Sequence, residues 1–413
     1  MIRSLTIGLP VGVESQFIIE TDVKRLIEIS KRVLNNAEIS PRTVRYTLPP
    51  IGSEGETAGY IPSILKWIDR LADETDVRWF CLPIDLITNG LRDECLSVVL
   101  GQINRFQKMF LNLMVSDKKK ISIPAINCAS EFVLQVAMKS NNGFDNFRVG
   151  ASCNCPANAP FFPFSRHKGN RVAFSFALEQ TDLALDIATR GGKNIKVDSF
   201  RDCLVEELSI ELEKIHRLGE QLAFESGCEY RGLDASFAPF PNEKTSVAAL
   251  IEKLLGAPVG SHGSLFITGL LTDSIRAALL KSGVLSVGFN GVMYSLLEDE
   301  SLASANSRRC INIDKLIALS SMCGCGIDMV PVPGMSFPEE IAVLMMDIAA
   351  MSHSLKKPLG IRVLPIPGGS ANEYTHFNLD FLCDSRIIGL TSNDRNIVSN
   401  SHSFSMMAPS RLK

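Results

Sequence analysis

The sequence predicts an α/β protein in which helices pack around one sheet or barrel, and three observations lead to that fold class. Strand-like and helix-like segments alternate along most of the 413 residues. Hydrophobic residues make up 46% of the chain, which is enough to bury a large core. No break in composition marks an internal linker, so we expect one domain over residues 1–390, a length that α/β barrels reach as single units.

The first half of the chain supplies most of the expected strands. Short apolar runs predict strands at Arg3–Gly8, Thr43–Leu48, Arg78–Ile84, Ile121–Ala125, Arg148–Ser152 and Val172–Leu178. Between them, apolar residues at helical spacing predict helices at Val23–Leu34, Pro62–Leu71, Glu94–Met114 and Ser130–Lys139.

The second half is richer in helices. Helical spacing predicts helices at Asp202–Glu225, Ser246–Leu255, Ser264–Lys281, Ile311–Ser320 and Glu339–Leu355. Strands are expected at Arg231–Ser236, Gly326–Val332 and Gly360–Pro365. Residues 391–413 are rich in Ser and Asn and have little periodicity, which is typical of a flexible C-terminal tail.

Four loops interrupt this regular alternation, of which the first is long and the other three share its character. They are Cys153–Gly169, which is rich in Pro and Phe, Ala238–Lys244, Ala257–Gly263 and Pro365–His376. Loops longer than about 12 residues without secondary structure are commonly functional. If these loops lie at one end of a barrel, they form its pocket.

Charge and composition exclude several classes of partner. The 42 Lys and Arg residues against 45 Asp and Glu leave a net charge of −3, without a basic block beyond Lys118–Lys120. That balance argues against nucleic acid as the main partner. The longest apolar run, Ile341–Met351, contains Asp347 and is too short to cross a bilayer.

Cysteine usage indicates a reducing compartment. Eleven cysteines are an odd number, and several, such as Cys81 and Cys128, lie in apolar surroundings. They are most simply small buried hydrophobic residues. The N-terminus alternates like a strand and lacks a signal-peptide cleavage pattern, so we expect a soluble cytoplasmic protein, with a homo-oligomer left open.

The strongest indication of a site is the stretch Ser320–Gly334. Cys323 and Cys325 alternate with Gly324 and Gly326, and Asp328 follows on a short strand. Glycine beside a thiol permits a positive φ and removes Cβ bulk, so that backbone and sulfur can approach a ligand. Cys323 is therefore a candidate thiolate nucleophile, with a buried structural thiol as the alternative.

Acidic residues near predicted element ends are further candidates. Asp234 lies at a strand end, and Glu298 follows an apolar run, positions from which an acid in a barrel often points into the site. Glu179 and Asp182 open a helix, where capping its positive dipole end is the competing interpretation.

Two basic residues suit an anionic ligand. His262 stands just before the Ser264–Lys281 helix, whose free N–H groups bind anions, although an ordinary cap explains it as well. Arg42 and Arg45 are three residues apart on a strand, so only one of them can face a barrel interior. We expect it to be Arg45, holding either a carboxylate or phosphate of a ligand or a barrel acid such as Asp234.

Five ordered motifs resemble one uncharacterised prokaryotic family. They are Arg42-Thr-Val-Arg45, Phe161-Phe-Pro with Glu179-Gln-Thr-Asp182, Gly232–Pro239, Gly288–Asp299 and Cys323–Gly334. The family is known as domain of unknown function 711, and the resemblance covers about residues 1–390. It implies a ten-stranded α/β barrel of the pyruvate formate-lyase-like type, as in glycyl-radical enzymes, and no established activity. Residue 325 is more often a hydroxyl residue in that family, which favours Cys323 as the site thiol.

The likeness to glycyl-radical enzymes suggests one comparison. Those enzymes carry an Arg-Val-Ser-Gly-Tyr-like turn near the C-terminus, and this chain has Arg386-Ile-Ile-Gly389. Only Arg and Gly match. Gly389 facing Cys323 would therefore satisfy only in outline the requirement of radical enzymes for a glycine opposite a thiol.

Taken together, the residues favour an enzyme that converts a small anionic metabolite at the barrel mouth by thiol or acid/base chemistry. The alternative is a non-catalytic sensor that binds a small ligand in the same pocket. A divalent metal held by the acids is a third alternative, within the enzyme class.

Overall fold

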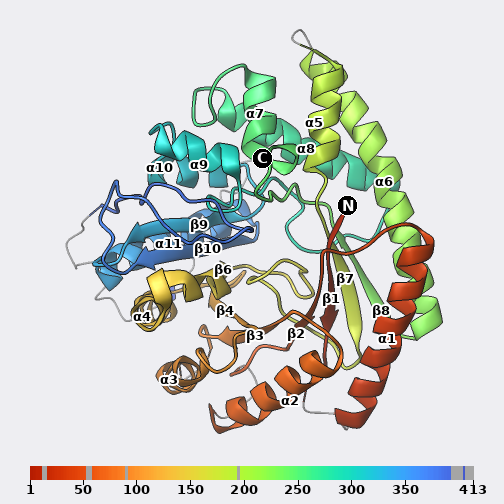
Figure 1. Ribbon diagram of the computed structural model, residues 1–413, viewed down its shortest axis with the longest axis vertical. Helices are drawn as coiled ribbons and strands as arrows, with labels where there is room; N and C mark the ends of the chain where they lie inside the picture. Colours follow the sequence, from red (N-terminus) through yellow and green to blue (C-terminus); the bar gives the residue numbers. More distant parts are fainter. Residues whose placement is uncertain (12–15, 53–57, 89–91, 193–195, 392–402, 405–413) are drawn as a thin grey trace.

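The computed structural model describes residues 1–11, 16–52, 58–88, 92–192, 196–391 and 403–404. Helices form an outer ring and the strands lie inside it (Figure 1). The strands are β1 Ile2–Gly8, β2 Thr43–Thr47, β3 Trp79–Asp85, β4 Met109–Ser116, β5 Ile121–Ser122, β6 Val149–Cys153, β7 Ala173–Leu178, β8 Glu229–Asp234, β9 Gly326–Pro333, β10 Leu359–Ile366 and β11 Ser403–Phe404.

The helices that surround them carry an apolar stripe on the side that faces the sheet. They are α1 Gln16–Asn36, α2 Ile61–Glu74, α3 Arg92–Gln102, α4 Ile123–Lys139, α5 Thr181–Arg190, α6 Val197–Ser226, α7 Val247–Leu255, α8 Ser264–Ser282, α9 Glu300–Ser307, α10 Ile313–Ser320 and α11 Pro338–Leu355. In α2, for example, the buried residues include Ile61, Ile64, Leu65, Ile68 and Leu71, which recur at the spacing of one helical face.

The sheet is mixed, and its strand order is β8-β7-β1-β2-β3-β4-β6-β10-β9, with β5 paired to β4 and β11 paired to β5. Strands β1, β2, β3, β4 and β6 run parallel to one another, as do β7 with β8 and β9 with β10. The pairs β1–β7 and β6–β10 are antiparallel. Every residue of β1, β7 and β10 is buried, as expected for strands covered on both faces.

This ladder of regular strands is open between β8 and β9. Isolated bridges connect the segment 286–295 to both edges: Ser286 pairs with Leu233 of β8, and Ser295 pairs with Asp328 of β9. A further bridge joins Val292 to Phe237, just beyond β8. The predicted α/β class is confirmed, whereas the regular strands do not form the closed barrel that we expected.

Most expected elements are confirmed, with two corrections in the first half. The predicted helix Glu94–Met114 ends at Gln102, and Met109–Ser116 forms the central strand β4. β4 is almost wholly apolar, with Asn112 as its one interior polar residue, so it lacks the alternation that would distinguish it from the preceding helix. The predicted strand Ile121–Ala125 stops at Ser122, because the Ser122 hydroxyl accepts a hydrogen bond from the Ala125 amide and caps α4.

The expected C-terminal tail, residues 391–413, lies largely outside the described residues. Within it, Ser403 and Phe404 pair antiparallel with Ser122 and Ile121 of β5. In the described chain, α-helices long and apolar enough to cross a membrane are absent.

Candidate functional site

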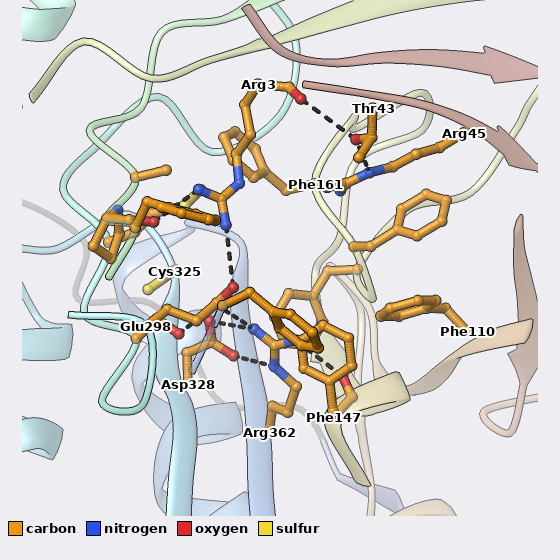
Figure 2. A pocket seen from close by; sticks show the side chains of 18 of the residues that line it. Arg3, Thr43, Arg45, Phe110, Phe147, Phe161, Glu298, Cys325, Asp328 and Arg362 are labelled. Carbon is orange, nitrogen blue, oxygen red and sulfur yellow. Dashed lines mark hydrogen bonds and ion pairs between the residues drawn. The ribbon is translucent and has the colours of Figure 1, made fainter. Parts of the chain in front are cut away.

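A cavity of about 240 Å³ lies inside the curled sheet (Figure 2). Its charged lining consists of five arginines and two carboxylates, and aromatic rings supply most of the remaining wall. The lining residues include Arg3, Arg42, Arg45, Arg78, Arg362, Glu298, Asp328, Cys325, Ser295, Trp79, Phe110, Phe147, Phe161, Phe162, Phe164, Phe240, Phe289 and Phe381. Two of the four predicted pocket loops contribute to it, Cys153–Gly169 through its phenylalanines and Ala238–Lys244 through Phe240.

Six alternating charges cross the cavity as one chain of ion pairs. Glu298 is central, because its Oε1 lies 3.2 Å from Arg3 Nη2 and its Oε2 lies 3.1 Å from Arg362 Nη2. Glu179 extends the chain on one side, pairing with Arg3 and, at 2.6 Å, with Arg42. We call this set the ion-pair chain; its members are Arg42, Glu179, Arg3, Glu298, Arg362 and Asp328.

The far end of the ion-pair chain is a two-point contact. Arg362 Nε donates to Asp328 Oδ1 at 2.6 Å, and its Nη2 donates to Oδ2 at 2.8 Å. Burial acts to raise the pKa of Glu298, but Arg362 and Arg3 outweigh it and lower that pKa below its ordinary value. Burial raises the pKa of Asp328, with Arg362 opposing. The acid with the raised pKa thus stands at the cavity wall, where proton transfer to a ligand is feasible.

A β-bulge places Asp328 against Arg362. In the β9–β10 pairing, Ile327 pairs with Ile361 and Val330 pairs with Val363, so β9 holds one more residue than β10 in between. To accommodate the extra residue, Met329 adopts the left-handed backbone conformation, with φ of 52°. This conformation costs on the order of 1 kcal/mol for a residue with a Cβ. Such bulges re-aim side chains beside sites, and this one turns Asp328 toward the cavity.

Arg45 of β2 is a buried cation that forms no ion pair with a described residue. It is 6% exposed, and its Nε donates to Thr43 Oγ1 at 2.9 Å. Its other nitrogens have no hydrogen bond or ion pair to a described residue; instead the guanidinium carbon lies 5.2 Å from the ring centre of Trp79 and 5.1 Å from that of Phe162. Burial, with repulsion from Arg3, lowers the pKa of Arg45 to about 9, so that the group is still charged at neutral pH.

The placement of Arg45 excludes Asp234, the barrel acid that the sequence offered as its partner. Asp234 is not its partner, since that carboxylate accepts hydrogen bonds from the amides of Ser236, Phe289 and Asn290 and from the Ser236 hydroxyl. Asp234 is fully buried away from the cavity lining and fastens the segment 286–295 to β8. Burial raises its pKa to about 6, with those hydrogen bonds opposing.

The two thiols take different places. Cys325 lines the cavity, whereas Cys323 is 0% exposed and lies outside its lining, so the accessible thiol expected at Cys323 is not present. Burial alone would raise the pKa of Cys323, but a hydrogen bond with Cys325, the charge of Lys357 and the Gly326 amide lower it to about 6. The hydrogen bond with Cys323, together with burial, raises the pKa of Cys325 well above its ordinary value. In this pair the proton is therefore favoured on Cys325, at the wall, and disfavoured on Cys323 behind it.

The glycines around these thiols serve close packing of the backbone. A Cβ on Gly324 would lie 2.9 Å from the backbone of Gly291, and one on Gly326, whose φ is 92°, would lie 2.3 Å from the Gly360 carbonyl oxygen. Both therefore allow neighbouring segments to approach. The expectation that they open a path to a ligand is wrong for these two positions, because protein backbone already occupies the space.

The remaining predicted residues divide between the ion-pair chain and the surface. Glu179 is fully buried and pairs with two arginines of the cavity, although it does not line the cavity itself. His262, Asp182 and Gly389 are exposed and lie outside the cavity lining. Gly389 is the residue compared above with the glycine of glycyl-radical enzymes.

Sequence reasoning missed Arg3 and Arg362 and excluded Arg42. The first two sit on fully buried strands, and a lone arginine within a buried apolar run was the signal that could have identified them. Arg42 precedes β2 and is therefore free of the strand alternation, so that it reaches the rim of the cavity 3.9 Å from the ring centre of Phe240.

The cavity carboxylates are poorly suited to a metal ion, since both are occupied by arginine. Across the described ranges, groups of three or more His, Cys, Asp and Glu side chains that could hold a metal are absent.

Comparison with known proteins identifies the family. The profile described as "Uncharacterised ACR (DUF711)" matches residues 12–381, so the chain belongs to that family. The match spans the strands that carry Arg45, Asp328 and Arg362.

The chain is also similar to several proteins named "UPF0210 protein". That of Pyrobaculum arsenaticum is 28% identical over 376 residues, which cover 86% of this chain and 80% of the relative. Those of Methanocorpusculum labreanum and Syntrophotalea carbinolica are each 24% identical over the same shares of both chains. The names of these relatives state no reaction.

Replacing Glu298 by Gln should destabilise the protein by about 3 kcal/mol or more, because the two buried arginines lose the negative charge that they share. The pKa of Glu298 is lowered in the fold, so the charge of Glu298 stabilises the protein above the unfolded pKa, about 4.3, and that contribution is lost as the pH falls further. Urea unfolding should show the difference between wild type and variant at pH 7 and its shrinkage below pH ~4. Glu213→Gln, in an exposed pair with Arg217, is the matched control and should change stability little.

Replacing Cys325 by Ala should raise the pKa of Cys323, because Cys325 no longer supplies a hydrogen bond to the thiolate. The thiolate absorbance of the native protein should then lose the step expected near pH 6 and show it at higher pH. An unchanged step would mean that Lys357 and the Gly326 amide alone maintain the thiolate.

Proposed function

We propose that this protein of the DUF711 family binds a small anionic metabolite in the arginine-lined cavity and converts it by acid/base chemistry. One observation supports this above all others: Arg45 is buried, charged and without a carboxylate partner among the described residues. An unpaired buried charge is costly, and an anionic ligand would supply the missing partner.

The charges around Arg45 strengthen the proposal. In the ion-pair chain, three arginines alternate with three carboxylates, so their charges cancel. Arg78 stands at the exposed edge beside Trp79 and adds a second positive charge near the opening. The cavity as a whole is therefore positive and attracts an anion.

Asp328 and Cys325 are the groups we assign to the chemistry. Asp328 has a raised pKa at the cavity wall, which suits proton exchange with a bound ligand. Cys325 stands nearby as a neutral thiol, and a nucleophilic role would require a proton shift within the Cys323–Cys325 pair.

A non-catalytic sensor is the second candidate, and a specific observation favours it. Both carboxylates at the cavity wall are already bound to Arg362, so neither is a free base while that contact lasts. In this alternative the ligand would be held without conversion.

We further propose that the sheet is a ten-stranded barrel of the pyruvate formate-lyase-like type, with segment 286–295 as the tenth strand. The isolated bridges from that segment to β8 and β9 support this, as do the two antiparallel junctions in an otherwise parallel order. Cys323 and Cys325 are not joined by a disulfide, which supports a cytoplasmic location.

Replacing Arg45 by Met should abolish anion binding and stabilise the ligand-free protein. Removing an uncompensated buried charge should raise the free energy of unfolding by about 1 kcal/mol or more. In the wild type, small carboxylates or phosphate should raise the melting temperature, and the variant should lose that gain. If Arg45→Met keeps the anion-induced gain, the anchor lies elsewhere and the proposal is wrong.

Turnover separates the enzyme from the sensor. The wild-type protein, Asp328→Asn and the surface control Asp182→Asn would each be incubated with an extract of small metabolites, which mass spectrometry then follows. An enzyme should consume at least one anion with wild type and the control but not with Asp328→Asn. If the protein is a sensor, the bound anion should stay chemically unchanged after incubation with the wild type and with both variants.

A further inference from the structure

We propose that the ligand of this cavity is a small aromatic carboxylate whose ring packs among the phenylalanines and whose carboxylate binds Arg45. This inference rests on the proposed anion site and adds the class of ligand. Charge, ring geometry and volume each support it.

The charge of the site favours a single carboxylate. Arg45 uses only its Nε for Thr43, so the edge of the guanidinium formed by its two Nη atoms is available. That planar edge matches a carboxylate through two parallel hydrogen bonds. A phosphate dianion would need a second free cation at the same depth, but Arg3 and Arg362 are each paired with two carboxylates.

The wall next to Arg45 is aromatic. Trp79 and Phe162 lie on the guanidinium, and Phe110 contacts both, at ring-centre distances of 5.2 Å and 5.3 Å. A ligand whose carboxylate meets Arg45 in this place sets its body against those rings. Aromatic rings prefer edge or offset contacts with other rings, which contribute about 0.5–1.5 kcal/mol beyond the burial of area.

Aromatic side chains continue along the cavity beyond Phe110. Phe147 lies 5.3 Å from Phe110, and Phe381 lies 5.7 Å from Phe147, again between ring centres. The wall available to a ligand is therefore apolar, with neighbouring rings tilted by 50–70° to one another, which suits edge contacts with a further ring and disfavours a hydrophilic acid such as a sugar acid.

The volume limits the ligand to one ring. The cavity of about 240 Å³ is smaller than the usual range of ~300–1,000 Å³ for pockets that hold drug-sized ligands. A single ring with a short acidic arm fits this space, whereas a nucleotide does not.

The test measures binding of five probes to full-length protein by calorimetry and thermal shift. The probes are benzoate, cyclohexanecarboxylate, acetate, phosphate and uncharged benzamide, at matched ionic strength. We expect benzoate to bind at least about tenfold more tightly than each of the others. Equal affinity for acetate or phosphate, or for cyclohexanecarboxylate, overturns the aromatic class while the anion site stands. Absence of binding by every anion, or binding that Arg45→Met leaves intact, overturns the proposed function as well.

Variants of the wall give a second, independent readout. Phe110→Leu should weaken benzoate about tenfold and leave any weak acetate binding unchanged, since acetate does not reach that ring. Phe381→Leu, at the less buried end of the wall, serves if Phe110→Leu fails to fold. The control is Phe337→Leu, which is 61% exposed and outside the cavity. Equal losses for benzoate and acetate in the wall variants would contradict the inference.

Discussion

The shared contact of Glu298 with Arg3 and Arg362 is the constraint on which the rest of the site depends. Arg3 lies on β1 and Arg362 on β10, and β2, β3, β4 and β6 separate those strands in the sheet. A single carboxylate can touch both only because the sheet curls until its inner faces oppose each other. Buried charges cost several kcal/mol each unless they are paired with good geometry, so this contact also fixes the spacing of the opposed strands. Side chains held in these ion pairs cannot close-pack the space between the opposed strands, and the cavity is that space.

A second consequence follows from the pairing of charges. Because three arginines and three carboxylates neutralise one another, the remaining buried arginine determines the sign of the cavity. Trp79 and Phe162 hold its guanidinium through their ring faces, an attraction worth about 0.5–2 kcal/mol and smaller than that of a buried carboxylate. The fold thus retains a buried charge, that of Arg45, which is energetically unfavourable without a ligand. Sites of function are the places where such local cost is expected, and the left-handed Met329 in the bulge beside Asp328 is another example.

The thiols illustrate how function and packing compete within one motif. Gly324 and Gly326 are required because the backbone of neighbouring segments passes within contact distance, at Gly291 and Gly360. The same close packing buries Cys323 and leaves Cys325 as the sulfur that the cavity exposes. Both thiols are buried, but their pKa values shift in opposite directions. The pKa of Cys323 is lowered, whereas that of Cys325, the thiol at the wall, is raised.

The sequence by itself determined the α/β class, most element positions and the inward-facing Arg45. Local periodicity is a property of neighbouring residues, so it identified β2 and its inward-facing Arg45 as well as the phenylalanine loop after β6. It misassigned β4, whose almost wholly apolar run has no period, and it favoured Cys323 over Cys325, the thiol that lines the cavity. The tertiary structure alone decided which charges meet. Asp234 fastens a turn, His262 faces solvent, and Glu298 joins two strands more than 350 residues apart along the chain, between Arg3 and Arg362. Such pairings depend on how far the sheet curls, and that curvature arises from the packing of the whole chain, which no local pattern records.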